Sequence, residues 1–175
     1  MEKIKENLGK IIITTGLVAA VFLGMSLFQM FDSSKINYVE LIVVLLAIAS
    51  CILLIVFGFK NEKIEKYLLL PFYLFAGSII VADFNNIIVD SSWLNAFSLL
   101  FSLAIIIFYT LHLVNGQSIF KDILVALLIA LSISHLVTLF NTTRMITSVS
   151  YLILSLTFVT CLLLHKKEET NLWKN

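Results

Sequence analysis

The sequence has few charged residues, few cysteines and a single proline, and the first two scarcities each exclude a class of protein. Of its 175 residues 13% are charged, whereas 60% are hydrophobic and the mean hydropathy is +1.03. Soluble domains are about a quarter charged, so this composition excludes an ordinary soluble protein. The formal net charge is +1 and the lysines are divided among short segments, which excludes the basic surface that nucleic-acid binding requires.

The two cysteines, Cys51 and Cys161, lie far apart within apolar runs. They form no Cys-x-x-Cys pair and have no histidine at a metal-ligand spacing, so we interpret them as small buried side chains. The sequence also lacks a glycine-flanked serine and a glycine-rich phosphate loop. We therefore predict no catalytic residue, no metal and no cofactor, and we favour a protein that is not an enzyme.

Long apolar runs are what the sequence has in abundance. A helix needs about 20 apolar residues to cross about 30 Å of hydrocarbon. Six runs of that length occur, at 11–31, 38–59, 67–89, 94–114, 119–140 and 146–165. The first run is longer than the apolar part of a signal peptide and is followed by no small-residue cleavage pattern, so we expect it to be retained. The sequence predicts an all-α integral membrane protein, with residues 1–175 forming a single transmembrane domain, a six-helix bundle surrounded by the lipid bilayer.

The distribution of lysine and arginine predicts the orientation, because positive residues in short loops stay on the cytoplasmic side. Ten of the twelve fall on the side of the chain ends, and Lys35 and Arg144 fall on the other. We expect both termini in the cytoplasm and the membrane to be a bacterial plasma membrane. Pro71 lies one turn into the third run, where a missing N–H costs little, and this favours a helix start there.

The first run carries a stripe of small residues on one helical face, Gly16, Ala20 and Gly24. Small side chains let a second helix backbone approach closely. We favour packing within the bundle for this stripe, and docking of a membrane partner subunit is the alternative.

Asp83 interrupts the third apolar run, and an ionisable residue inside a span predicts a functional site. Other polar residues recur at helical spacing on the third to sixth spans, always in the half away from the chain ends. The candidate ligand-binding residues are Asp83, Asn86, Asp90, Ser98, Ser102, His135, Thr138, Ser148, Tyr151 and Ser155. The inner halves of these spans are mostly apolar. This asymmetry favours a polar cavity open to the outside, about 10 to 13 Å deep at 1.5 Å per residue. Hydroxyl groups that only hold the helices together are the alternative.

His135 lies at a depth similar to that of Asp83, and a contact between the two would stabilise the charged form of both. A separately solvated pair is equally consistent with the sequence. If the two do meet, they provide either part of a ligand site or an acid–base pair.

In organisation the chain resembles the substrate-binding S-components of energy-coupling-factor transporters: under two hundred residues, six spans, both termini inside, an outward polar site and a small-residue stripe on the first span. The resemblance implies a small solute captured from outside, together with ATPase and coupling subunits. Gly16, Ala20 and Gly24 would stand where that family docks its coupling partner on an alanine stripe.

Two other functions are consistent with the sequence. One is an intramembrane enzyme that modifies a lipid, with Asp83 and His135 as acid and base. The other is a non-catalytic accessory or immunity-type membrane subunit whose polar residues serve assembly. We favour binding or transport of a small solute, because the polar residues are confined to one side of the membrane.

Overall fold

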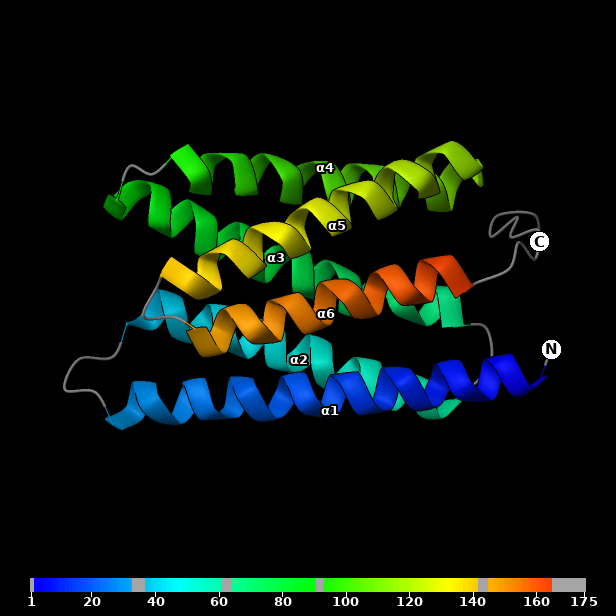
Figure 1. The fold of residues 1–175 in the computed structure, drawn as a ribbon, viewed down its shortest axis with the longest axis horizontal. Helices are drawn as coiled ribbons and strands as arrows, with labels where there is room; N and C mark the ends of the chain where they lie inside the picture. The colour runs from blue at the N-terminus through cyan, green and yellow to red at the C-terminus, as the bar shows by residue number, and fades with distance from the viewer. Residues whose placement is uncertain (1, 33–36, 61–63, 91–92, 142–144, 165–175) are drawn as a thin grey trace.

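The computed structural model describes residues 2–32, 37–60, 64–90, 93–141 and 145–164, and this part of the chain forms six α-helices (Figure 1). They are α1 (Glu2–Asp32), α2 (Tyr38–Lys60), α3 (Ile64–Asp90), α4 (Trp93–Asn115), α5 (Ser118–Asn141) and α6 (Met145–Leu164). Each is long and apolar enough to cross a membrane, so the predicted multi-pass helical bundle is confirmed. His165, the last residue of the sixth predicted span, lies outside the described residues.

The six helices form a closed ring in which they follow one another in chain order. Each helix contacts the next one, and α6 returns to contact α1. Short connections make sequence neighbours antiparallel, as Figure 1 shows. The start of α1 and the end of α6 consequently lie at the same end of the bundle, near the labels N and C.

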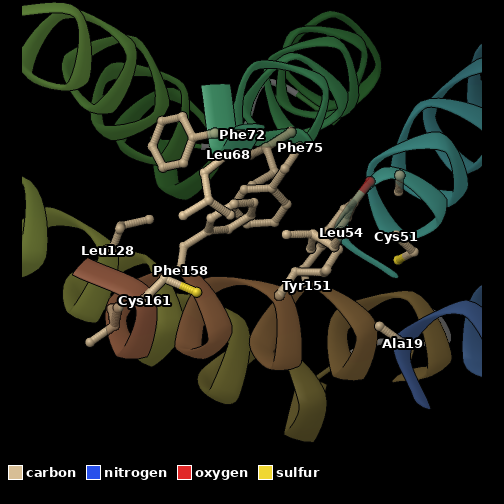
Figure 2. Close-up of a cluster of buried hydrophobic side chains, with 14 of the residues drawn as sticks. Ala19, Cys51, Leu54, Leu68, Phe72, Phe75, Leu128, Tyr151, Phe158 and Cys161 are labelled. Atoms are coloured by element: carbon tan, nitrogen blue, oxygen red, sulfur yellow. The ribbon is translucent and has the colours of Figure 1, made fainter. Parts of the chain in front are cut away.

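Aromatic side chains fill the centre of the ring between α3 and α6 (Figure 2). The Phe158 ring of α6 is perpendicular to that of Phe72, with centroids 5.0 Å apart, and lies 5.3 Å from that of Phe75. Phe72 also stacks on Tyr109 of α4 at 4.0 Å. In contrast, Phe28 on the outer face of α1 is 74% exposed, as expected for a side chain that meets lipid.

Glycines bring α1 and α2 into close contact at two levels. A Cβ atom added to Gly16 would lie 3.0 Å from Ile55 Cγ1 and 3.5 Å from the Cys51 carbonyl oxygen. A Cβ atom on Gly58 would lie 2.8 Å from Ile13 Cγ1. The absence of these side chains is what allows the two backbones to approach.

The small-residue stripe of α1 therefore divides into two parts. Gly16 is buried against α2, and Ala20 is half-buried against the core. Gly24 is exposed, and nothing would lie within 4 Å of an added Cβ atom. Packing within the bundle accounts for the first two residues and not for the third.

Pro71 does not mark the start of a helix, because α3 begins seven residues earlier, at Ile64. The proline lies inside the helix, where its missing N–H removes one backbone hydrogen bond. The Ser50 hydroxyl of α2 donates to the Pro71 carbonyl at 2.7 Å, so a neighbouring helix supplies a polar contact at this point. The two cysteines are free and buried, as the sequence predicted.

Candidate ligand-binding site

Four of the predicted polar residues lie at a similar depth in the part of the bundle away from the chain ends. Asp83 precedes the end of α3 by seven residues, and His135 precedes the end of α5 by six. Ser98 follows the start of α4 by five residues, and Tyr151 follows the start of α6 by six. At 1.5 Å per residue, all four lie about 8 to 10 Å from the helix ends.

Tyr151 is the centre of this group. Its ring lies 5.3 Å from the His135 ring of α5 and 6.1 Å from the Phe75 ring of α3. Figure 2 shows its side chain reaching from α6 across the interior. Asp83 is near enough for its charge to act on the Tyr151 hydroxyl. The Ser78 hydroxyl also lies nearby, but it donates to the Phe75 carbonyl at 2.7 Å and makes no hydrogen bond to Tyr151 by distance and angle. The tyrosine thus joins the polar residues of α3 to those of α5.

Asp83 lies beside α4, where the Ser98 hydroxyl is placed to donate a hydrogen bond to its carboxyl group. Asp83 is 8% exposed and Ser98 is 7% exposed. The contact between Asp83 and His135 that the sequence suggested stays a prediction. The His135 ring lies against Tyr151, while Asp83 is directed to Ser98.

Two polar atoms of this group are buried without a hydrogen bond to any described residue, Asp83 Oδ2 and Tyr151 Oη. Tyr151 is 6% exposed, so bulk solvent does not reach these atoms freely. Buried polar atoms in folded proteins nearly always have a partner, and each exception requires an explanation. A bound solute or ordered water would provide the missing hydrogen bond to each atom.

Glu40 of α2 is a further acidic residue at this end of the bundle, and it was not among the predicted residues. It is half-buried in the first turn of α2, and its charge also acts on the Tyr151 hydroxyl. The sequence signal is misleading here, because an acidic residue in a first turn is typical of helix capping. Asn37 does cap this helix, since its Oδ1 accepts hydrogen bonds from the N–H groups of Val39 at 3.1 Å and Glu40 at 3.4 Å. Ser78 was also not predicted.

Aromatic rings separate this group from the half of the bundle near the chain ends. Phe75 touches Tyr151 on one side and Phe158 on the other. Phe72 and Tyr109 continue the stack toward α4. Four side chains that the sequence placed in an open cavity are thus buried in this structure, Asp83, Ser98, His135 and Tyr151, with an aromatic layer beneath them.

Two of the predicted ligand-binding serines are instead bonded within the protein. The Ser102 hydroxyl donates to the Ser98 carbonyl at 2.9 Å. Ser155 lies 2.7 Å from the hydroxyl of Ser132 and 3.0 Å from the Leu152 carbonyl, to which it can donate. The bond between Ser132 and Ser155 joins α5 to α6 and fits the alternative prediction, in which hydroxyl groups hold the helices together. The Ser102 bond lies within α4.

Four predicted residues remain, and the structure describes the side chains of two of them. Asn86 is half-buried and Ser148 is buried, and both take part in interactions. The side chains of Asp90 and Thr138 lie outside the described part of the structure. Among the described residues, no three His, Cys, Asp or Glu side chains gather as a metal site would require.

The hydrogen bond between Ser132 and Ser155 provides a test of how strongly these hydroxyls join α5 to α6. A double-mutant cycle with Ser132→Ala and Ser155→Ala is expected to give a coupling of about 0.6 kcal/mol, because hydrogen bonds between membrane helices are worth about that much on average. Thermal unfolding in detergent measures it. Additive effects of the two substitutions would show that the contact contributes nothing to stability.

The chain has no match among protein-family models, curated proteins or solved structures.

Proposed function

We propose that this protein binds a small solute between α3, α4, α5 and α6. The observation that carries the proposal is the pair of buried atoms, Asp83 Oδ2 and Tyr151 Oη, for which the described residues provide no hydrogen bond. If this group served only assembly, a hydrogen bond to each of these atoms would make the fold more stable, because each unpaired buried polar atom costs about 1 to 3 kcal/mol. An uncompensated cost of this kind is typical of a functional site.

The distribution of lysine and arginine supports entry of the solute from outside the cell. The group lies at the end of the bundle opposite the start of α1 and the end of α6. By the positive-inside rule the chain ends are cytoplasmic, so the polar group belongs to the outer half of the membrane. Because Asp83 and Tyr151 are buried, solute entry requires neighbouring helices to separate at this end.

The arrangement supports binding rather than acid–base catalysis. An acid–base pair needs both groups within reach of the same substrate atoms. The described contacts give Asp83 a neighbour on α4, Ser98, and give the His135 ring a neighbour on α6, Tyr151. The proposal does not include a coupling subunit docked on the α1 stripe, because Gly16 is already in contact with α2.

Co-purification tests the proposal whatever the chemical identity of the solute. The wild-type protein is purified in mild detergent from its native host and denatured, and the released small molecules are identified by mass spectrometry. We expect a compound that is enriched with the wild-type protein and reduced at least about tenfold with Asp83→Asn, because the variant loses a charge-assisted hydrogen bond.

The matched control is Asp122→Asn, which removes a carboxylate from an exposed position near the start of α5. This variant is expected to retain the compound. Circular dichroism and gel filtration show whether each variant is folded. Equal amounts of every released compound in the wild type and a folded Asp83→Asn variant would contradict solute binding at this site.

A further inference from the structure

We infer that the solute carries a positively charged ammonium group, an inference that rests on the proposed solute-binding function and specifies the solute's chemical class. The inference depends on three properties of the residues around Tyr151: the sign of their charges, the kind of hydrogen-bonding atoms that they leave unpaired, and the aromatic rings beside them.

The charges that act on the Tyr151 hydroxyl are acidic. They come from Asp83 of α3 and, less strongly, from Glu40 of α2. The sequence has no lysine or arginine in 67–120 or in 122–143, so α3, α4 and α5 bring no such residue to this depth. The two basic residues expected at this end, Lys35 and Arg144, lie outside the described residues.

His135 is the basic side chain within the group, and its ring lies against Tyr151. An anionic solute would thus meet carboxylates and no lysine or arginine of the described helices. Like charges placed together in an interface cost several kcal/mol, whereas a cation would compensate the carboxylate of Asp83. Charge therefore selects against an anion and in favour of a cation.

The unpaired atoms fit the same class of ligand. A carboxylate oxygen such as Asp83 Oδ2 only accepts hydrogen bonds when it is ionised, and Tyr151 Oη can accept as well. An ammonium group has only donors, up to three N–H bonds on a primary amine. It can therefore donate to either buried oxygen, Asp83 Oδ2 or Tyr151 Oη.

The aromatic rings supply the third property. The Tyr151 ring has Phe75 at 6.1 Å and His135 at 5.3 Å, so aromatic rings from α3, α5 and α6 lie together at this point. A cation is attracted to the face of an aromatic ring within about 6 Å, and the attraction grows when water is excluded. Both a methylated and an unmethylated ammonium group would benefit from it.

Pairs of solutes with equal shape and different charge test the inference. Purified protein in detergent is titrated in a calorimeter with choline and with its neutral isostere 3,3-dimethylbutan-1-ol. The same is done with ethanolamine and ethylene glycol, and with glycolate as an anion. We expect the cation of at least one pair to bind at least about tenfold more tightly than its neutral partner, and glycolate not to bind.

Substitutions of the acidic residues test whether they cause the preference for a cation. Asp83→Asn is expected to abolish the difference between cation and neutral partner, whereas the control Asp122→Asn retains it. Glu40→Gln is expected to reduce the difference a few-fold, because its carboxylate acts from the neighbouring helix. Competition of bound ethanolamine by phosphatidylethanolamine in nanodiscs, and not by phosphatidylglycerol, would identify a lipid headgroup as the source of the ammonium group.

Failure of the inference is distinguishable from failure of solute binding. If a neutral partner or glycolate binds as tightly as the cation and still requires Asp83, the ammonium class is wrong while solute binding stands. The same holds if the compound that co-purifies has no positive charge. If no probe binds and no compound co-purifies, both proposals are wrong.

Discussion

Replacing Phe158 by alanine is expected to lower the free energy of unfolding by about 3 kcal/mol, the low end of the range for buried Phe→Ala substitutions. The side chain is 1% exposed and touches Phe72 and Phe75 across the centre of the ring. Lipid is as apolar as a protein core, so little of this loss comes from transfer of the ring out of water. Most of it comes from the cavity and from lost aromatic contacts, each worth about 0.5 to 1.5 kcal/mol.

The measurement is thermal unfolding in detergent followed by circular dichroism. Phe28→Ala is the matched control, because the same side chain is removed from a position that is 74% exposed on α1. It is expected to change stability little. If the two variants unfold at the same temperature, the aromatic centre does not hold α3 to α6 as we describe.

Replacing Gly58 by leucine is expected to separate α1 from α2 and to destabilise the fold by about 1 to 3 kcal/mol or more, the usual cost of overpacking. Even a Cβ atom there would lie 2.8 Å from Ile13 Cγ1 and 3.2 Å from the carbonyl oxygen of Gly9. The Ile13 side chain can rotate away, but the Gly9 carbonyl belongs to the backbone of α1. The helix itself must therefore move.

Gly24→Leu is the control for this prediction, since nothing would lie within 4 Å of an added Cβ atom at Gly24. Gel filtration shows whether each variant is monodisperse, and thermal unfolding compares their stability. We expect Gly24→Leu to behave like the wild type. The reverse order, with Gly24→Leu the more damaging variant, would show that the stripe of α1 contacts another protein.

Much of the architecture could be predicted from the sequence, because the length of an apolar run reports directly on the thickness of a bilayer. Each predicted span lies within one observed helix, apart from His165 beyond the described residues. Pro71 was misinterpreted because α3 starts three residues before the third apolar run. Polar residues at the membrane surface can join the first turn of a helix, so the helix extends beyond the apolar run, and Pro71 lies inside it. The predicted start of the third span was therefore too late as a helix boundary.

The members of the candidate site could be predicted in part. Asp83, Ser98, His135 and Tyr151 were found because a polar residue in an apolar run is conspicuous in the sequence. Glu40 was overlooked because it lies in a first turn, where an acidic residue has a local explanation. Gly58 was overlooked because a single glycine in a span carries no sign of which helix lies opposite it.

The sequence by itself determined the number of spans, their order and the half of the bundle that contains the polar residues. Only the tertiary structure decided which faces turn inward, which serines bond to one another, and which buried oxygens lack a partner. The physical reason is that lipid and protein interior are about equally apolar. Hydrophobicity therefore does not separate Phe158, which is 1% exposed, from Phe28, which is 74% exposed, and only the packing of six helices around Tyr151 does.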